Sequence, residues 1–305
     1  MGTVLEISLH GLERQAAAPV LDELYAVATE LDALLSVYES DSEVSRLNRT
    51  AGGGPQRVDG RVADLLERSI GFAELTGGAF DVSVGPLVEL WTRAAQRGAP
   101  PTPGELAEAR ALVGSQLIEL GPDGTAALRR EQMALNLGGV AKGYALDLML
   151  PVLERHGASS ALLNFGQSST WALGAPPASS GWRLLVRGPE GDYAGLITLK
   201  DRALSVSGSL GQWSEIGGQR YGHIIDPRSG APLLRPRQAL VVAPRAALAE
   251  ALSKALLILE AEAGLALVAA QEGCHGLLIE GDGELRTTSG WERAVSFERL
   301  REPNP

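Results

Sequence analysis

Apolar residues in much of the chain recur every three or four positions, which is the period of an amphipathic helix. The first such helix is predicted from Pro19 to Leu35, after an apolar-polar alternation at residues 4–9 that predicts a strand. Pro19 suits a first turn, because the N–H that proline lacks has no helical partner there. Further helices are predicted at 62–76, ended by Gly77 and Gly78, at 141–156, ended by Gly157, and at 103–113, 246–260 and 264–271.

After Gly157 the pattern changes to short apolar runs separated by glycine, serine and proline, which is typical of antiparallel strands. These runs are residues 161–163, 182–186, 194–199, 203–207 and 238–242, and 276–283 reads as a hairpin. Helices and strands are interleaved without a regular βαβ order, which predicts an α+β fold of mostly antiparallel sheets flanked by helices. We expect one two-lobed domain over residues 1–300 and a loose tail at 301–305.

Composition narrows the possible functions. The 305 residues hold 27 Lys+Arg against 37 Asp+Glu, a net charge of −10, and no basic cluster, which argues against a nucleic-acid partner. The single cysteine, Cys274, excludes an internal disulfide framework and is expected in the core, and the four histidines lack the spacing of a zinc pair. No run of about 20 apolar residues predicts a transmembrane segment.

The N-terminal residues have neither the basic nor the apolar region of a signal peptide. The protein is therefore expected in the cytoplasm if Met1 is its true start, and in the cell envelope if a leader was removed.

Two segments carry the residue types of phosphate chemistry. Residues 136–144 form a glycine-rich turn opening into a helix, where backbone N–H groups and Lys142 could hold a phosphate. The turn is not a Walker A loop, because Gly143 follows the lysine, and an ordinary structural turn is the alternative. In 221–230, Asp226 could orient His223 as a general base, and a hairpin loop with a solvated histidine is the alternative.

Three further segments contain candidate residues that also have an ordinary structural interpretation. Asp81 follows two glycines that allow close approach of a ligand, or it marks a helix end and an ordinary strand start. Tyr38 could stack on a planar ring, or it could be a half-buried tyrosine at a helix end. Glu250 and Lys254 are four residues apart on a predicted helix, the spacing of a surface ion pair.

Taken in order, these motifs resemble the FAD:protein FMN transferases, the ApbE family, over nearly the whole chain. The matching segments are Met1–Thr3, Tyr38 with Ser42–Asn48, Gly77–Asp81 with Gly85–Leu87, Leu137–Tyr144, Asn164–Gly166 and His223–Gly230. The resemblance implies a two-lobed fold with a cleft for FAD between the lobes. It also implies cleavage of FAD with Mg²⁺ and transfer of FMN to a Thr or Ser of an acceptor flavoprotein, with release of AMP, or hydrolysis of FAD in some members.

Carried over by position, the resemblance assigns His223 as the catalytic base and Asp226 as its orienting partner. The residues that would contact FAD are Met1, Tyr38, Ala79, Phe80, Asp81, Asn136, Lys142, Ile224 and Ile225. The metal ligands would be the Gly139 carbonyl, Glu250 and the position of Lys254.

This chain departs from the family pattern at three of these positions. Asn136 replaces the usual Asp, and Glu250 and Lys254 replace an Asp and a Thr that bind the metal. A protonated lysine cannot ligate Mg²⁺. The sequence therefore leaves three hypotheses open: a flavin transferase or FAD pyrophosphatase, a catalytically weakened flavin-binding or sensor protein, and a structural domain that binds no flavin.

Overall fold

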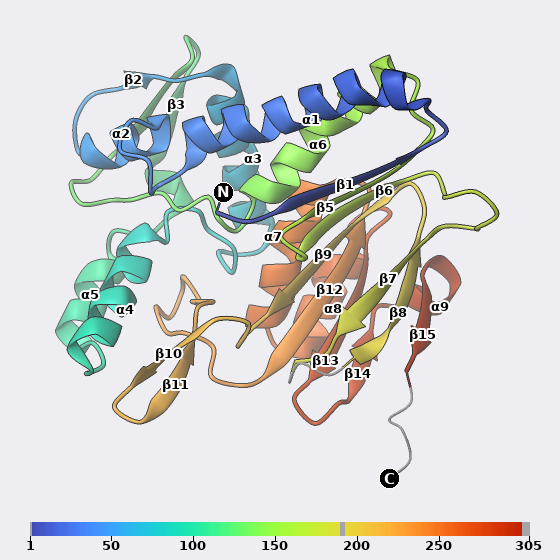
Figure 1. Cartoon of the computed structure of the whole chain (residues 1–305). Coiled ribbons are helices and arrows are strands. Elements are labelled where there is room, and N and C mark those ends of the chain that lie inside the picture. The colour runs from blue at the N-terminus through green and yellow to red at the C-terminus, as the bar shows by residue number, and fades with distance from the viewer. Residues whose placement is uncertain (1, 190–192, 301–305) are drawn as a thin grey trace. The chain divides into compact units, whose positions relative to one another are not determined.

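The computed structural model describes residues 2–189 and 193–300. The predicted FAD contact of Met1 and the predicted loose tail at 301–305 lie outside these residues. Figure 1 shows the elements of the α+β fold. The helices are α1 (Arg14–Leu35), α2 (Glu43–Arg49), α3 (Gly60–Leu75), α4 (Gly85–Arg97), α5 (Pro103–Arg110), α6 (Ala141–Arg155), α7 (Ala246–Ile258), α8 (Ala261–Ala269) and α9 (Trp291–Ala294). No helix of the described residues is long and apolar enough to cross a membrane.

The predicted helices are all present, and their bounds differ most at the start of α1, at the end of α5 (Arg110, predicted 113) and at the start of α8 (Ala261, predicted 264). Helix α1 begins at Arg14, so Pro19 lies inside the helix and not in its first turn. The residues before the proline include three alanines, whose high helix propensity extends the helix backward. The strand expected to begin after Asp81 is wrong, because helix α4 begins there at Gly85 with Pro86 in its first turn. Proline at that position favours a helix start.

The described chain divides into two compact units. Unit 1 contains residues 29–141 and 209–234, and unit 2 contains residues 2–28, 142–208 and 235–300. Neither unit is one continuous stretch of sequence.

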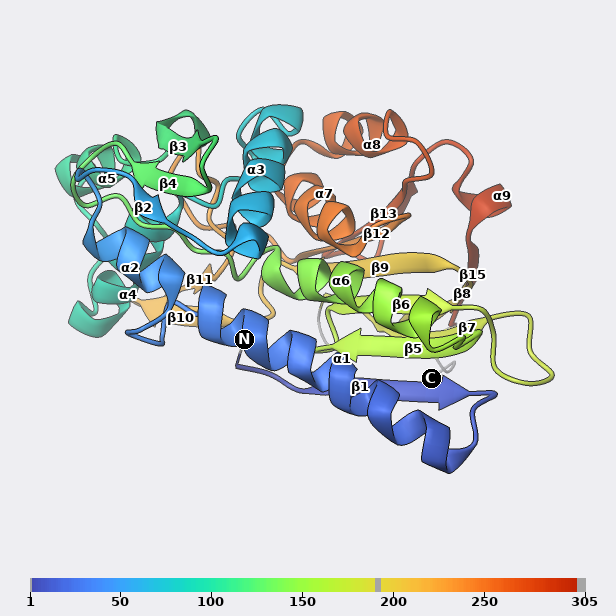
Figure 2. The same cartoon turned by 90° about the horizontal axis from the view of Figure 1, so that it is seen from above.

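Unit 2 is built on a seven-stranded sheet in the order β1-β5-β6-β9-β12-β13-β14, in which all neighbouring strands are antiparallel. Its strands are β1 (Leu5–His10), β5 (Ser160–Phe165), β6 (Ser169–Leu173), β9 (Arg202–Gly208), β12 (Arg237–Ala243), β13 (His275–Glu280) and β14 (Leu285–Thr287). Helix α7 packs on β9 and β12, and α8 packs on β13 (Figure 2). The runs predicted at 161–163, 203–207, 238–242 and 276–283 lie in this sheet as β5, β9, β12 and β13, whereas β6 was not predicted.

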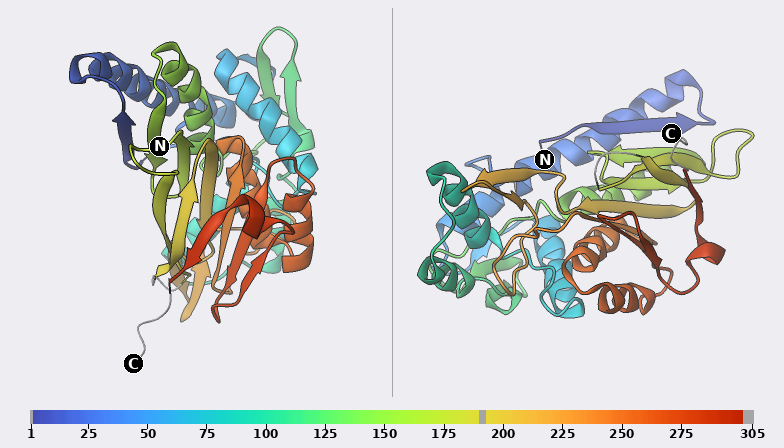
Figure 3. Two further views of the ribbon diagram at one scale, coloured as in Figure 1. Left: turned by 90° about the vertical axis from the view of Figure 1, so that its right-hand side faces the viewer. Right: turned by 90° about the horizontal axis from the view of Figure 1, so that it is seen from below.

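A second sheet of unit 2 contains β7 (Trp182–Arg187), β8 (Tyr193–Leu199) and β15 (Ser296–Arg299). The red β15 pairs antiparallel with the yellow β8 (Figure 3). Buried side chains from this sheet, including Trp182 and Ile197, pack with Leu204, Leu240 and Leu277 of the larger sheet. This apolar layer holds the two sheets of unit 2 together.

Unit 1 combines helices α2 to α5 with two small sheets. One sheet contains β2 (Gln56–Arg57), β4 (Thr125–Leu128) and β3 (Ile118–Gly121), with the 3₁₀ turn Ser115–Leu117 before it. The other is the hairpin of β10 (Trp213–Ile216) and β11 (Gln219–Gly222). The sequence patterns predicted neither this hairpin nor helix α2.

Candidate active site

Unit 1 brings together sequence motifs that lie far apart along the chain. The side chain of Asn48 donates to the carbonyl of Leu135 at 3.1 Å and accepts from the N–H of Leu135 at 2.7 Å. The carbonyl of Val82 accepts from the N–H of Asn136 at 2.7 Å. The motifs around residues 48, 82 and 136 therefore form one connected region of unit 1.

Gly85 explains why these segments can approach so closely. Its N–H donates to the carbonyl of Ala134 at 3.1 Å. A Cβ at position 85 would lie 2.4 Å from that same oxygen, which no real side chain tolerates. Glycine is thus required by the contact between the two backbones.

The three predicted FAD residues after the double glycine are all buried: Ala79 is 1% exposed, Phe80 5% and Asp81 8%. The Asp81 carboxylate accepts from the N–H and hydroxyl of Ser83, at 2.8 and 2.6 Å, and from the N–H of Ser115 at 2.8 Å. This carboxylate organises the loop. Its contact with FAD, like those of Ala79 and Phe80, stays a prediction.

His223 is exposed and follows strand β11 directly. Its Nδ1 lies 3.0 Å from the carbonyl oxygen of Gln212, which also accepts from the backbone N–H of His223 at 3.0 Å. Because a carbonyl oxygen can only accept, Nδ1 carries the proton in this bond. In the neutral ring Nε2 then has a lone pair and can accept a proton, as a general base must.

Asp226 is engaged by Arg228. Its carboxylate accepts from the Nε, Nη2 and backbone N–H of Arg228, at 2.9, 3.0 and 2.9 Å. The carboxylate raises the pKa of the guanidinium. The orienting bond that the structure gives His223 comes from Gln212, so the predicted role of Asp226 toward His223 stays a prediction.

The loop that carries His223 is packed against the glycine motif and helix α4. A Cβ at Gly78 would lie 3.6 Å from Cγ of Arg228, and the indole of Trp91 donates to the carbonyl of Gly230 at 2.8 Å. Ile225 is 9% exposed and packs in a cluster with Leu87. The side chain of Ile225 is therefore committed to this apolar cluster, and a contact of Ile225 with FAD stays a prediction.

The remaining predicted residues of unit 1 are more open to solvent. Tyr38 is 93% exposed, so the half-buried alternative is wrong and its stacking on a flavin stays a prediction. Ile224 and Gly139 are partly buried. The side-chain oxygen of Asn136, also partly buried, accepts from the N–H of Gly138 at 3.0 Å, which fixes the glycine-rich turn.

Unit 2 carries the other predicted residues, gathered around one buried carboxylate. Glu250 is 0% exposed, so the alternative of a surface ion pair is wrong. Its Oε2 accepts from the N–H of Gly143 at 2.8 Å, and its Oε1 accepts from the hydroxyl of Ser169. The ammonium of Lys142 lies 3.5 Å from Oε1. Both carboxylate oxygens are therefore already bonded within the protein.

The N-terminus of α7 is held against α6 by two features. The Asp147 carboxylate accepts from the N–H groups of Ala246 and Ala247, at 2.8 and 3.1 Å, where a helix leaves such donors free. A Cβ at Gly143 would lie 2.5 Å from the carbonyl oxygen of Ala246, so only glycine fits. These contacts position Glu250 one turn further along α7.

Lys254 follows Glu250 by one turn of α7 and is partly exposed as a whole residue. Burial of its ammonium lowers the pKa of Lys254 to about 8, the charge of Glu250 opposes this shift, and that of Lys142 adds to it. Lys254 thus lies in the same electrostatic cluster as Lys142 and Glu250.

The predicted magnesium ligands do not fit that ion. Magnesium prefers six oxygen ligands in an octahedron. Glu250 supplies one carboxylate whose oxygens are bonded to Gly143 and Ser169, and Lys254 supplies an ammonium, which cannot ligate a cation. No group of three or more His, Cys, Asp or Glu in the described part of the chain could hold a metal ion.

Sequence reasoning missed Gln212, Ser169 and Asp147, which orient the predicted residues. Gln212 acts through its backbone carbonyl, which any residue type offers, so no sequence signal marks it. Asp147 lies five residues after Lys142, among the apolar residues of the predicted helix. A carboxylate in such a position is a sequence signal that could have been used. The core position of Cys274 is confirmed, since it is 3% exposed and burial raises the pKa of its thiol to about 11.

Comparisons with known proteins agree with this arrangement of motifs. The family model described as "ApbE family" matches residues 1–287. A FAD:protein FMN transferase of Treponema pallidum is 32% identical over 95% of this chain and 85% of its own length, and one of Salmonella typhimurium is 29% identical over 93% and 83%. The flavin transferase ApbE from Vibrio cholerae superposes with a TM-score of 0.82 at 26% identity, covering 96% of both chains.

The apbe protein from Thermotoga maritima superposes with a TM-score of 0.84 at 25% identity over 96% of both chains. An α+β fold with this order of motifs defines an enzyme of the flavin transferase class. The chain belongs to the ApbE family, as the resemblance of its motifs indicated.

Proposed function

We propose that this chain cleaves FAD and transfers FMN to a threonine or serine hydroxyl of an acceptor flavoprotein, releasing AMP. The hydroxyl oxygen forms a bond to the phosphorus of the FMN phosphate. The bond from that phosphorus to the bridging oxygen breaks, and AMP leaves with that oxygen. The proton of the hydroxyl passes to Nε2 of His223.

The observation that carries this proposal is the bond between Nδ1 of His223 and the Gln212 carbonyl. It leaves Nε2 as the basic nitrogen of an exposed ring, where a macromolecular hydroxyl can reach it. The exposed position matters because the acceptor is a protein, which cannot enter a closed cavity. Hydrolysis of FAD follows from the same geometry when water replaces the hydroxyl.

The test is incubation of the protein with FAD and an acceptor flavoprotein that carries a target threonine, with and without Mg²⁺. We expect AMP in solution and FMN covalently attached to the acceptor, detected by chromatography and by mass spectrometry. An acceptor with that threonine changed to valine should gain no FMN. Absence of both AMP and adduct under all metal conditions contradicts the proposal.

A second candidate, a flavin-binding or sensor protein with little catalysis, is favoured by the ammonium of Lys254 beside Glu250. It predicts tight binding of FAD that is recovered intact after long incubation. The two candidates differ in the AMP they release, so the same experiment separates them. A structural domain would bind no flavin, which an FAD titration detects.

A further inference from the structure

The charged groups around Glu250 in unit 2 are mainly positive, as in a site that binds an anion. The chain contains three lysines, Lys142, Lys200 and Lys254, and two of them lie in the electrostatic cluster of Glu250. Two ammonium groups and one carboxylate give 2 − 1 = +1 when all three are charged. The carboxylate is completely buried, so water screens this net positive charge weakly.

The carboxylate of Glu250 is already engaged within the protein. Gly143 and Ser169 donate to its two oxygens, and Lys142 lies within 3.5 Å of one of them. A divalent cation would have to share these oxygens with their donors and would be repelled by the two ammonium groups. Of the positions that the family resemblance marks as metal ligands, Lys254 places a positive side chain where the family has Thr, and Glu250 keeps a carboxylate that is engaged by Gly143, Ser169 and Lys142.

We propose that Lys142 and Lys254, held by Glu250, bind a phosphate group of FAD directly, so that flavin binding by this chain needs no divalent cation. The inference rests on the proposed function, because it takes FAD as the ligand. Ammonium groups donate charge-assisted hydrogen bonds to phosphate oxygens, and their positive charge attracts the phosphate as the charge of a metal ion would. The first turn of α6, which carries Lys142, adds the positive end of a helix.

The first experiment titrates FAD into the protein in EDTA and again in excess Mg²⁺, following flavin fluorescence. We expect dissociation constants that agree within about threefold. In Lys254→Thr, binding in EDTA should weaken roughly tenfold to a hundredfold, the range for loss of a charged hydrogen bond. Lys200→Thr is the matched control, because Lys200 is exposed in a turn, and should bind as the wild type does.

The second experiment adds Mn²⁺ alone and counts bound ions by electron paramagnetic resonance. We expect no tight Mn²⁺ in the wild type and a gain of Mn²⁺ binding in the double variant Glu250→Asp with Lys254→Thr. Circular dichroism checks that each variant folds, and Lys254→Met serves in the FAD titration if Lys254→Thr does not.

The inference is overturned if wild-type protein binds FAD only with Mg²⁺, if it binds Mn²⁺ tightly, or if the Lys254 variants bind FAD in EDTA as well as the wild type does. These outcomes leave the proposed function intact. Failure to bind FAD under any condition would instead remove the proposed function together with the inference.

Discussion

A backbone carbonyl decides the protonation pattern of His223. The oxygen of Gln212 holds the Nδ1 proton in place, which makes Nε2 the basic nitrogen of the neutral ring. No carboxylate is needed for this orientation, and Asp226 meanwhile bonds the guanidinium of Arg228. Sequence reasoning found His223 by its motif, whereas Gln212 could not be predicted, since a main-chain atom leaves no mark on residue choice.

We predict that His223→Asn lowers the rate of AMP release by roughly 10²- to 10⁴-fold, the usual contribution of a general base. Affinity for FAD should change by no more than a few-fold, because asparagine preserves a polar group at the site. Single-turnover AMP release and an FAD titration measure the two quantities separately.

The control for this prediction is His156→Asn. His156 pairs with Glu23 at 2.8 Å within unit 2, and its replacement should leave both quantities unchanged. Joint loss of affinity and turnover in His223→Asn would make His223 a binding residue, and unchanged turnover would exclude it from the mechanism.

At the scale of elements, the packing of α7 on α6 places the Glu250 cluster. Gly143 allows the contact because its Cα faces the backbone of Ala246. The sequence predicted both helices, since their apolar periodicity is strong. It could not show that the glycine serves helix packing and not only a phosphate turn, because that contact joins segments about 100 residues apart.

We predict that Gly143→Ala destabilises the protein by about 1–3 kcal/mol, as is usual for an extra methyl group in a filled space. The Cβ would meet Ala246 at 2.5 Å and displace the start of α7. Urea unfolding measures the change. Gly71→Ala in α3 is the matched control: its Cβ meets nothing within 4 Å, so it should stabilise by about 0.5–1 kcal/mol. Equal effects of the two substitutions would contradict the packing argument.

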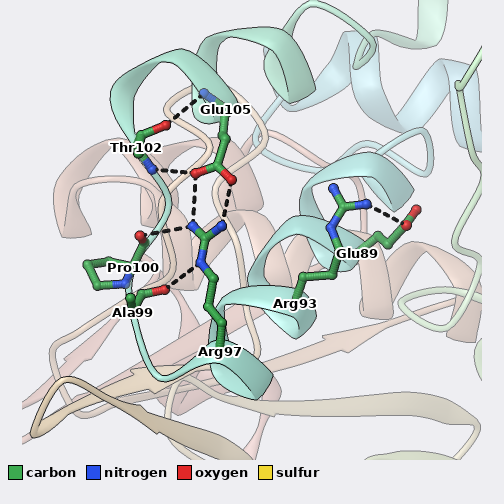
Figure 4. Close-up of polar contacts among 7 residues, drawn as sticks. All are labelled: Glu89, Arg93, Arg97, Ala99, Pro100, Thr102 and Glu105. Atoms are coloured by element: carbon green, nitrogen blue, oxygen red, sulfur yellow. Dashed lines mark hydrogen bonds and ion pairs between the residues drawn. The ribbon is translucent and has the colours of Figure 1, made fainter.

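The connection between α4 and α5 is held by hydrogen bonds and an ion pair among neighbouring residues of the chain (Figure 4). Glu105 accepts from the N–H of Thr102 at 2.7 Å and from both Nη atoms of Arg97, at 2.6 and 2.8 Å. The threonine hydroxyl accepts from the N–H of Glu105, which completes a capping box. Thr102, Pro103 and Glu105 are helix-start signals that sequence reasoning can use.

We predict that Glu105 contributes to the stability of the fold in a pH-dependent way. Its pKa is lowered from 4.5 to about 2, mainly by its bonds to Arg97. A carboxyl with a lowered folded pKa stabilises the fold above its unfolded pKa and loses that effect as the pH falls through the folded value. Glu105→Gln should therefore lower the melting temperature at pH 7, and the difference from wild type should shrink between pH 4.5 and 2.

Added salt should also reduce this difference, because the pair is exposed. Glu89→Gln, which removes the single bond between Glu89 and Arg93 in Figure 4, should have a smaller effect on the melting temperature at pH 7. If the difference in melting temperature between Glu105→Gln and wild type were constant over the whole pH range, the lowered pKa of Glu105 would be contradicted.

For the whole molecule, local sequence patterns predicted the α+β class. They did not predict which segments of the chain belong to which of the two compact units. The chain passes from one compact unit to the other after residues 28, 141, 208 and 234. Three of these passages fall inside or at the end of regular elements, α1, α6 and β9, where no composition change marks a boundary. The single domain over 1–300 and the FAD cleft between its lobes stay predictions.

The chain contains only three lysines, and this has a practical consequence for chemical labelling. Lys142 is only 18% exposed and pairs with Glu250, and Lys254 has a buried ammonium although the residue as a whole is partly exposed. Lys200 is thus the one exposed lysine among the described residues, since Lys142 and Lys254 are partly buried. Apart from the α-amino group, an amine-reactive dye or surface linker will find essentially one side chain to attach to, which offers a defined handle for immobilising the protein. Lysine-specific cross-linkers, by contrast, will map very little of its surface.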